Sequence, residues 1–304
     1  MEFGGLSIGD PAMLIVEDAR SRIAVRPDMG AGLARFDALT ADGPKPVLRP
    51  AAAGGNHPFD LACNLMLPFA NRISGGGFGF DGSFHPVPPN LPDDDPCPLH
   101  GDGLQRAWSV VAHQADRIEL ALDEGAIGPW RYSARIEWRL EDGTLHGTLT
   151  VTNTGARLPF GGGFHPWLPR LDRTTLCFRA SHVWLSDAAN LPTKRMPITG
   201  RPQWDFSKPS ALPGDRIDNC FDGWDGKAVV TQPDLGIDVS VSVSQNLDHA
   251  MVFAPSVNAG FFCFEPVSHA VDAINAPGHP GMIVLAPGDA MTLSMTLGWA
   301  PRDR

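Results

Sequence analysis

The sequence Phe261-Phe262-Cys263-Phe264-Glu265-Pro266 leads an apolar run directly into a carboxylate. A run with so little alternation is typical of a strand that is buried on both faces. Proline cannot donate a backbone hydrogen bond to a sheet, so we expect the strand to end near Pro266. Glu265 is then expected at a strand end, where its charge needs hydrogen bonds or has a chemical task. The alternative for this glutamate is an ordinary salt bridge at a sheet edge.

The composition around this stretch favours an all-β fold. Glycine (33 residues) and proline (29 residues) are frequent, charged residues make up only 19% of the chain, and long helical periodicity is missing. Many short apolar segments separated by turn residues predict a β-sandwich or barrel. No composition break, linker or internal repeat divides the chain, so we expect one domain over residues 1–304.

Several short segments have the pattern of strands. The clearest is a long antiparallel hairpin, in which residues 132–140 and 144–152 alternate apolar and polar side chains. Residues 282–285 and 291–297 are predicted to form a hairpin that turns at Pro287-Gly288, and residues 40–60 are predicted to be loop. The other predicted strands are residues 13–16, 23–25, 33–36, 108–112, 118–122, 175–179, 183–185, 228–231, 237–243 and 251–254.

Residues 74–107 consist mainly of Gly, Pro, Asp and polar residues. A loop of this length is uncommon in a compact domain unless it has a function. Its interleaved phenylalanines predict a packed loop with a short hairpin over residues 78–84. We interpret Asp93-Asp94-Asp95 as an acidic loop apex rather than a cation site. His100-Gly101 lies just before a strand, which is a favourable position for a site residue.

Polar side chains also interrupt or follow apolar runs near residues 71 and 218. Asn71 and Arg72 follow the run that ends at Ala70. Arg72 is either a surface charge or a donor fork for hydroxyls or carboxylates. Asp218 lies in an apolar frame, so it either caps a turn or is partly buried and needs partners.

The segment Gly161-Gly162-Gly163-Phe164-His165-Pro166-Trp167 combines three glycines with a histidine and a tryptophan. The glycines permit close approach of another backbone or of a ligand. His165 is either a buried structural imidazole or a site residue at a strand exit. Trp167 either packs in the core or offers an apolar face on which a sugar ring stacks.

Charge and cysteine content argue against several classes of protein. The formal net charge is −10, so neither nucleic acid nor an anionic membrane is an expected partner. The five cysteines are odd in number, lie far apart and form no CxxC, which favours a reducing compartment over a disulfide framework or zinc ribbon. The N-terminus has no basic region followed by a long apolar one, and no apolar run reaches the about 18–20 residues of a membrane span. A cytoplasmic protein is therefore expected.

Five short motifs occur in order along the chain: Asn71-Arg72-Ile73, Leu99-His100-Gly101, Phe164-His165-Pro166, Ile217-Asp218-Asn219 and Phe264-Glu265-Pro266. Together they resemble the aldose 1-epimerase (galactose mutarotase) family, over roughly residues 12–299. Smaller matches at Leu191-Pro192-Thr193 and Leu285-Ala286-Pro287-Gly288 support the resemblance.

This resemblance implies a large antiparallel β-sandwich, the galactose mutarotase-like supersandwich. It also implies an isomerase that acts on a small-molecule sugar without metal or organic cofactor, as a monomer or homodimer. Glu265 is implied as the catalytic base and His165 as the catalytic acid. The implied sugar-binding residues are Asn71, Arg72, His100 and Asp218, together with Trp167, which stands where many members have Tyr. Asp102 and Lys194 also depart from the family pattern and bear on the choice of sugar.

Interconversion of the α and β anomers of a hexose requires ring opening. One group removes the proton of the C1 hydroxyl, and another protonates the ring oxygen O5 as the C1–O5 bond breaks. The open aldehyde then rotates about C1–C2 and closes on its other face. A carboxylate and an imidazolium on opposite sides of C1 suffice, and each transfer contributes about 10²–10⁴-fold. We expect the carboxylates of Glu265 and Asp218 to raise the pKa of His165.

The residues leave four alternatives open. An epimerase of a phosphorylated or acidic sugar needs cations at the rim, for which the candidates are Arg170, Arg173, Lys194, Arg195 and Arg201. A non-catalytic carbohydrate-binding protein of the same fold is the second alternative. A glycosidase needs a pair of carboxylates, which Asp218 and Glu265 supply. A metal enzyme is least favoured, because His57, His85, His100 and His165 lack the usual ligand spacing.

Overall fold

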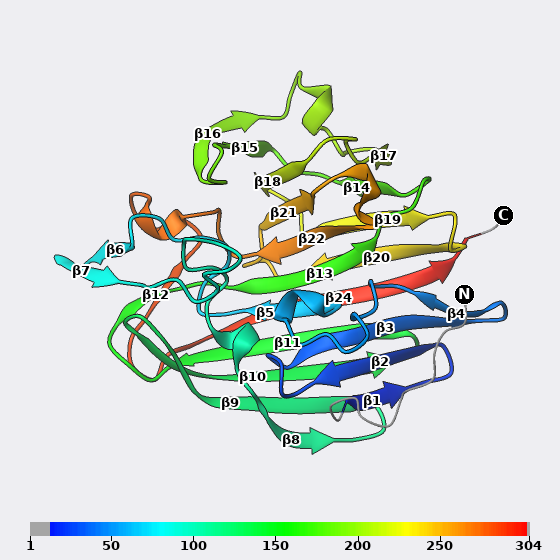
Figure 1. Cartoon of the computed structure of the whole chain (residues 1–304), viewed down its shortest axis with the longest axis horizontal. Helices are drawn as coiled ribbons and strands as arrows, with labels where there is room; N and C mark the ends of the chain where they lie inside the picture. The colour runs from blue at the N-terminus through cyan, green and yellow to red at the C-terminus, as the bar shows by residue number, and fades with distance from the viewer. Residues whose placement is uncertain (1–12, 303–304) are drawn as a thin grey trace.

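The short apolar segments assemble into two large antiparallel sheets that lie face to face in the computed structural model, which describes residues 13–302 (Figure 1). One sheet has 11 strands and the other has 9. The prediction of an all-β sandwich is therefore confirmed. The first twelve residues, part of the N-terminal stretch considered above for targeting, lie outside the described range. Within residues 13–302, no helix has the length and apolar character needed to cross a membrane.

The 11-stranded sheet carries most of the residues singled out above. Along the sheet, its strands are β1 (Leu14–Glu17), β2 (Ser21–Arg26), β3 (Gly32–Thr40), β5 (Cys63–Met66), β13 (Gly163–Pro169), β22 (Phe261–Val267), β21 (His249–Ala254), β18 (Ile217–Asp222), β15 (His182–Ser186) and β16 (Pro192–Pro197), with β4 (Gly43–Pro46) paired to β3.

The 9-stranded sheet covers the inner face of the first. Its strands, in spatial order, are β17 (Ser210–Ala211), β14 (Thr175–Phe178), β19 (Lys227–Gln232), β20 (Ile237–Val243), β24 (Ala290–Pro301), β11 (Thr144–Asn153), β10 (Trp130–Glu141), β9 (Arg117–Ile127) and β8 (Ser109–His113).

Two small ribbons and five 3₁₀ turns complete the structure between residues 13 and 302. The ribbons pair β6 (Gly77–Phe80) with β7 (Ser83–Pro86) and β12 (Leu158–Phe160) with β23 (Ile283–Leu285). The 3₁₀ turns are η1 (Pro58–Asp60), η2 (Gly103–Gln105), η3 (Pro202–Trp204), η4 (Val257–Ala259) and η5 (Ala273–Asn275).

Two hairpin predictions are confirmed and one is wrong. The long hairpin forms between β10 and β11, and the short hairpin in the 74–107 loop forms between β6 and β7. The last predicted hairpin does not form, because β23 pairs with β12 while β24 pairs with β11 and β20. The turn at Pro287-Gly288 therefore joins strands of different sheets. Residues 40–60 also contain β4, which was predicted as loop.

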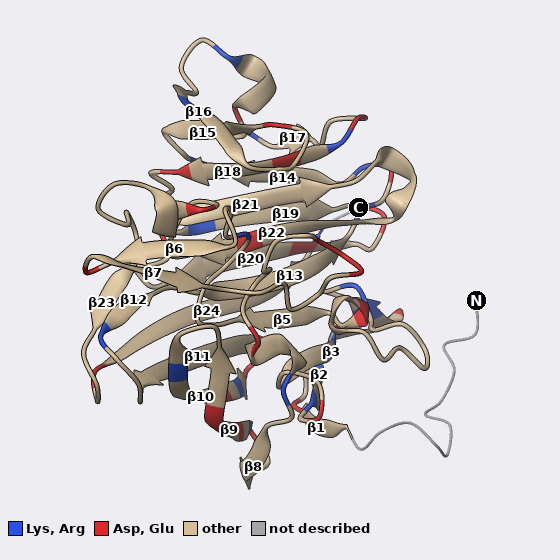
Figure 2. Ribbon diagram, turned by 60° about the vertical axis from the view of Figure 1, so that its left-hand side comes forward, with Lys and Arg blue, Asp and Glu red and all other residues tan. Residues whose placement is uncertain are grey.

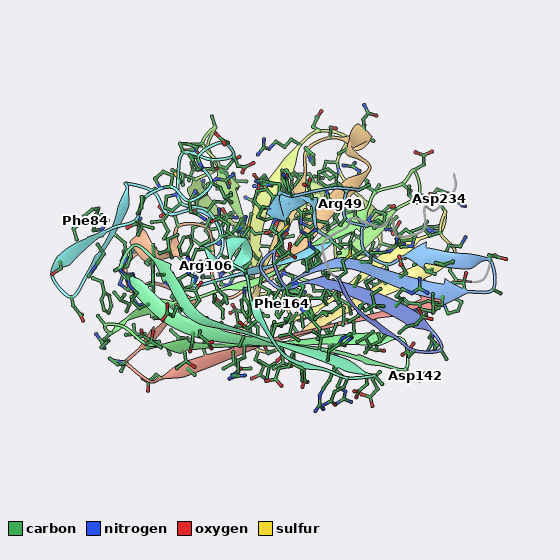
Figure 3. All side chains as sticks on the ribbon, turned by 60° about the horizontal axis from the view of Figure 1, so that its bottom comes forward. Arg49, Phe84, Arg106, Asp142, Phe164 and Asp234 are labelled. Atoms are coloured by element: carbon green, nitrogen blue, oxygen red, sulfur yellow. The ribbon has the colours of Figure 1, made fainter. Side chains whose placement is uncertain are left out.

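The central strand β22 is buried from Phe262 to Val267, as its apolar sequence predicts. It does not stop at Pro266 but continues by one residue, because Pro266 lies opposite Ala250 in the ladder with β21. Phe164 of β13 and Phe264 of β22 are fully buried on the side of the second sheet, where Phe164 packs 6.0 Å from Trp138 of β10, measured between ring centroids. Figure 3 shows Phe164 in the interior between the sheets and Phe84 far from it, on the β6–β7 hairpin.

The net negative charge is not gathered on one side of the molecule. Figure 2 shows acidic and basic positions interspersed over the strands and loops. Ion pairs such as Arg35 with Asp37 and Arg173 with Asp234 account for part of this mixture. Acidic and basic side chains that are interspersed in this way offer no broad surface of one sign for a polyelectrolyte partner.

Gly163 begins β13 where the backbones of three strands come close together. A Cβ atom on this residue would lie 2.2 Å from the carbonyl oxygen of Pro266 in β22. Gly162 is similarly tight, with 2.5 Å to the carbonyl oxygen of Met66. The glycine run therefore permits another backbone to approach, which is one of the two roles that the sequence suggested.

We expect Gly163→Ala to lower the free energy of unfolding by about 3 kcal/mol, because the new methyl group meets a backbone oxygen that no rotamer change can move. Urea unfolding monitored by circular dichroism measures the loss. Gly79→Ala is the matched control, since a Cβ there has no neighbour within 4 Å, and it is expected to change stability by less than about 0.5 kcal/mol. Equal losses in the two variants would show that the close approach is not tight.

Candidate functional site

His165 and Glu265 are brought together by the register of two neighbouring strands. Gly163 pairs with Val267 and Trp167 with Cys263, so the same register places His165 opposite Glu265. Residues opposite each other in an antiparallel pair point to the same face of the sheet. Because Phe164 and Phe264 face the core, His165 and Glu265 point to the outer face. The distance between His165 Nε2 and Glu265 Oε1 is 3.4 Å.

Both side chains of this pair are largely removed from water. His165 is 5% exposed and Glu265 is 3% exposed. Within the described part of the chain, His165 Nδ1 and Glu265 Oε2 are buried polar atoms that have no hydrogen-bond partner. Such orphaned atoms are rare in structural positions and common where a ligand supplies the missing bond. Neither the edge salt bridge considered for Glu265 nor the fully bonded structural imidazole considered for His165 is therefore realised.

The prediction that the pKa of His165 is raised is wrong. Burial lowers the pKa of His165 to about 3, and the positive charge of Arg49 adds to this effect. Burial also raises the pKa of Glu265 well above its usual value, helped by Asp218 and opposed by Arg72. The neighbouring carboxylates were expected to favour an imidazolium, but desolvation outweighs them because both groups are dry. In the free site, the neutral imidazole faces a carboxyl group that favours its protonated form.

His100 stands beside His165 and has a fixed tautomer. The two rings meet edge to face, with 5.2 Å between centroids. The backbone N–H of Asn71 donates to His100 Nδ1 over 3.0 Å. Burial lowers the pKa of His100 well below its usual value, so the ring is neutral and carries its proton on Nε2. His100 is therefore a hydrogen-bond donor toward the site.

Two β-bridges hold the His100 loop against the segment that follows β5. Leu67 pairs with Gly101, and Arg72 pairs with Leu99. Gly101 has φ of +69°, and a Cβ there would lie 1.7 Å from the carbonyl oxygen of Leu67, so this position requires glycine. The His100-Gly101 motif thus fixes the imidazole next to Asn71 and Arg72.

Arg72 is an inward-facing donor fork and not a surface charge. Its side chain is 12% exposed, and its Nε donates to Asp95 Oδ2 over 2.6 Å. The side-chain oxygen of Asn71 accepts from both the backbone N–H and Nη1 of Arg72, so Asn71 orients the arginine. Asp95 was predicted at an exposed loop apex, but it is buried because it is the counter-ion of Arg72.

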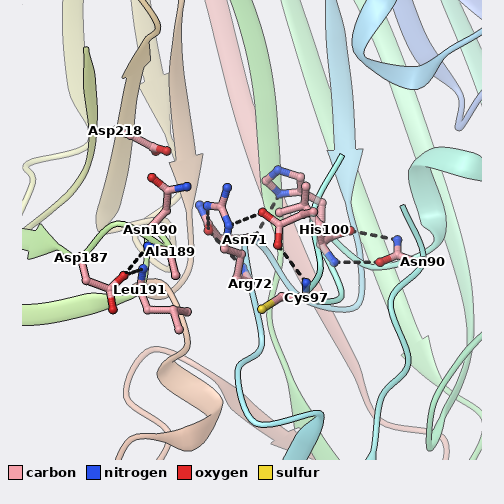
Figure 4. Close-up of polar contacts among 12 residues, drawn as sticks. Asn71, Arg72, Asn90, Cys97, His100, Asp187, Ala189, Asn190, Leu191 and Asp218 are labelled. Carbon is pink, nitrogen blue, oxygen red and sulfur yellow. Dashed lines mark hydrogen bonds and ion pairs between the residues drawn. The ribbon is translucent and has the colours of Figure 1, made fainter. Parts of the chain in front are cut away.

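Asp218 is the second residue of strand β18 and pairs with Phe253 of β21, which excludes the turn cap considered from sequence. Its side chain is 12% exposed and accepts from Nη2 of Arg216 over 2.9 Å. The same Nη2 donates to the side-chain oxygen of Asn190 over 3.1 Å. In the view of Figure 4, Arg72 lies between His100 on one side and Asn190 with Asp218 on the other. Asp218 is close enough to Glu265 to help raise its pKa, and it has a partner, Arg216, that the sequence did not indicate.

Trp167 is not an open stacking platform. The indole is 6% exposed. The imidazole of His165 stacks on it with 4.8 Å between centroids and 16° between planes, and the guanidinium carbon of Arg49 lies 4.1 Å from a ring centroid. The proposed sugar-stacking face of Trp167 is therefore covered by protein, and a contact between Trp167 and substrate stays a prediction.

The site brings together donor atoms of the kind that bind metals. One nitrogen each of His100 and His165 and one oxygen of Glu265 lie within 4.8 Å of one another, although their spacing in the sequence gave no sign of this. His100 does not fit a metal, however. Its Nδ1 already accepts a hydrogen bond and its Nε2 holds the proton, so neither nitrogen offers a free lone pair. Two ligands are left, which is too few for a protein zinc site.

A hollow of about 1070 Å³ lies outside this cluster, and its lining includes Leu39, Arg173, Leu235 and Trp299. Its rim is formed by the β3–β4 turn, the β19–β20 turn and the end of β24. It contains none of the catalytic or sugar-binding residues that the family resemblance implies, although Arg173 was a rim candidate for an acidic sugar. The candidate site is defined by its buried polar groups and not by the volume of a cavity.

Sequence reasoning missed three residues that contact the predicted site, Arg49, Asp95 and Arg216, and also Asn190, which is bonded to Arg216. Asp95 and Arg216 lie in polar loops where charged residues are ordinary, so their identity alone gave no signal. Asp102 departs from the family pattern, and the structure explains why. Its carboxylate accepts a hydrogen bond from the hydroxyl of Tyr132 in β10 over 2.7 Å.

A model of the family described as aldose 1-epimerase matches residues 13–298 of this chain. The chain belongs to the aldose 1-epimerase family. A relative in the family, the Escherichia coli K12 protein named "Uncharacterized protein YphB", is 35% identical over 262 residues, which cover 83% of this chain and 88% of that protein.

Solved structures of this family share the fold. A crystal structure from Escherichia coli K12, of a protein named "putative aldose 1-epimerase", superposes with a TM-score of 0.88 at 31% identity, and the match covers 95% of this chain and 99% of that one. Galactose 1-epimerase from Lactobacillus acidophilus NCFM superposes with a TM-score of 0.70 at 16% identity, covering 98% of each chain. The second likeness shows the fold alone.

We expect Asp95→Asn to lower the free energy of unfolding by about 2 kcal/mol, because it removes the charge that pairs with the buried guanidinium of Arg72 while keeping an oxygen for the backbone N–H of Cys97. Urea unfolding measures the change. Asp93→Asn is the control, since Asp93 is exposed in the same loop, and it should leave stability within about 0.5 kcal/mol of wild type. If both variants match wild type, the Arg72–Asp95 pair contributes nothing.

Proposed function

We propose that this protein is an aldose 1-epimerase that interconverts the α and β anomers of a neutral hexose by acid–base ring opening and closure. Membership of the family supports an isomerase of this kind. The observation that carries the proposal is the dry pair of Glu265 and His165, 3.4 Å apart, with one unpartnered atom on each group. Two unsatisfied groups of this type are suited to the two oxygens that exchange protons during ring opening.

The arrangement favours a pair that acts side by side. The hydroxyl oxygen O1 and the ring oxygen O5 are bonded to the same carbon, so neighbouring groups on one face of the sheet can serve both. We therefore propose that the two groups act from adjacent strands on one face of the sheet, rather than from opposite sides of C1. Glu265 takes the proton from O1, and His165 delivers a proton to O5 as the C1–O5 bond breaks.

The number of protons on the pair stays constant through the reaction. Before ring opening the pair is a carboxylate and an imidazolium, and after it the pair is a carboxylic acid and a neutral imidazole. The second form is the one that burial favours in the free site. Ring closure reverses both transfers after the aldehyde has rotated. The lowered pKa of His165 therefore moves one proton within the pair and does not remove the acid from the mechanism.

His100 and Arg72 supply donors for the remaining ring hydroxyls. The Nε2–H of His100 is directed to the site by the fixed tautomer, and Arg72 is held by Asn71 and Asp95. Asp218 supplies an acceptor. Preorganised polar groups reject sugars that lack the matching hydroxyl, because the protein group is then left unpaired.

The contacts favour a neutral sugar over a phosphorylated one. Four of the five basic residues suggested for a phosphate rim are bonded elsewhere: Arg170 to backbone carbonyls, Arg173 to Asp234, Arg195 to Asp222 and Arg201 to Pro197 and Thr199. The fifth, Lys194, is exposed on β16. At the site itself, Arg72 and Arg216 are each paired with an aspartate. A phosphate group would have to break one of these pairs.

We expect the protein to accelerate anomer exchange of hexoses such as glucose or galactose, measured by magnetisation-transfer NMR, and to act at least tenfold less efficiently on their 6-phosphates. Glu265→Gln and His165→Gln are each expected to lower kcat by about 10²–10⁴-fold. Glu137→Gln and His146→Gln are the matched controls on the outer face of the other sheet and should keep wild-type rates. Sugar binding without exchange would overturn the proposal in favour of a binding protein, and a preference for the phosphates would overturn the choice of substrate.

A further inference from the structure

Arg49 is a cation without a carboxylate partner in the described structure. It follows β4, and its Nη2 donates to the backbone carbonyl oxygens of Phe59 and Leu61 over 2.6 and 2.9 Å. Its backbone N–H donates to the carbonyl oxygen of Trp167 over 2.7 Å. Burial lowers the pKa of Arg49. A guanidinium is not deprotonated in proteins, so the side chain carries a full charge beside the site.

The guanidinium of Arg49, the indole of Trp167 and the imidazole of His165 form a stacked column. The guanidinium lies 4.1 Å from the centroid of the indole ring, and the imidazole lies nearly parallel to the indole at 4.8 Å. A cation over an indole is attracted by the electrons of the ring. The column therefore links a fixed positive charge to the proposed acid of the reaction.

The indole in the middle of the column is held by its own contacts. The indole N–H of Trp167 donates to the side-chain oxygen of Asn64 over 3.1 Å, and Asn64 in turn donates to the carbonyl oxygen of Pro58 over 2.7 Å. Phe59, next to Pro58, packs against Trp167 and His165 with centroid distances of 5.9 and 6.0 Å. Trp167 can hardly rotate while these contacts persist, so the plane of the imidazole is set by its neighbours.

We propose that Arg49 is a positioning residue that acts on His165 through Trp167: it fixes the plane of the imidazole and places a fixed positive charge beside it. This inference rests on the proposed function for its catalytic consequence. Arg49 lies outside the five motifs that carry the family resemblance.

The charges around His165 leave this task to Arg49. The other titratable or charged groups near the imidazole are Glu265 and Cys263 on β22, Cys63 on β5, His100 and Arg72 in the covering loops, Asp218 on β18 and Asp60 in η1. Glu265 and Asp218 favour an imidazolium, the charge of Arg72 is paired with Asp95, and His100 is neutral. Burial lowers the pKa of His165, and the positive charge of Arg49 adds to this effect.

The test removes the charge of Arg49 while keeping most of its length. In Arg49→Met, we expect kcat for anomer exchange to fall about tenfold while KM changes less than about threefold, because the imidazole is displaced but the sugar-binding donors are intact. Removing a positive charge favours the imidazolium, so the pKa of His165 should rise by roughly one pH unit from about 3. Nitrogen-15 NMR of the imidazole, with His165→Gln used for assignment, measures this shift without reference to activity.

A second variant of Arg49 separates the effect of its charge from that of its stacking. Arg49→Lys keeps the charge but not the planar guanidinium, so we expect His165 to protonate as in wild type while kcat stays reduced. Arg201→Met is the matched control. Arg201 also donates to two backbone carbonyls, but it lies in the loop that follows β16.

Circular dichroism checks that each variant is folded. If Arg49→Met does not fold, Arg49→Lys alone decides whether the planar guanidinium positions the imidazole. Wild-type kcat and wild-type His165 protonation in both Arg49 variants would overturn the inference. If the wild-type protein exchanges no anomers, the proposed function fails, whereas the NMR titration still decides whether Arg49 controls the imidazole.

Discussion

The constraint on which this site depends is the removal of water from one carboxyl group and one imidazole that face each other across β13 and β22. Dehydration disfavours the charged form of each group, so it raises the pKa of Glu265 and lowers the pKa of His165. The pair therefore shares one proton, which rests on the carboxyl group. The strands hold the groups at 3.4 Å, which neither group could achieve on a mobile loop. Chemistry at this pair therefore needs a substrate that brings its own hydroxyl groups into a dry place.

The architecture provides this environment from two directions. Below the sheet, Phe164 and Phe264 pack against the second sheet and fix the two strands from the inside. Above it, the segments around Phe59 and His100 close over the outer face, and each brings polar groups that are already bonded to other protein atoms. Only a few atoms, among them Glu265 Oε2 and His165 Nδ1, are left without partners within residues 13–302. Their isolation distinguishes this part of the sheet from an ordinary hydrophobic face.

The sequence predicted the local structure well and the long-range electrostatics poorly. The apolar run before Glu265 and the glycines before His165 predicted buried strands with a close approach, because local composition decides both. The sign of the His165 pKa shift depends on how dry the pair is, and dryness comes from Phe59, Trp167 and the His100 loop, which are distant in the sequence. The wrong hairpin at Pro287-Gly288 has a similar origin, since the turn residues are correct but the partner strand β12 lies more than one hundred residues earlier.

Infrared difference spectroscopy of the free protein against Glu265→Gln tests the central claim most directly, because a protonated carboxyl group and a carboxylate absorb at different frequencies. The account predicts a protonated-carboxyl band from Glu265 that persists well above its ordinary pKa of 4.5 and is lost only at higher pH. A carboxylate band at neutral pH that titrates near 4.5 would contradict the account, since the pair would then not be dry enough to share a proton.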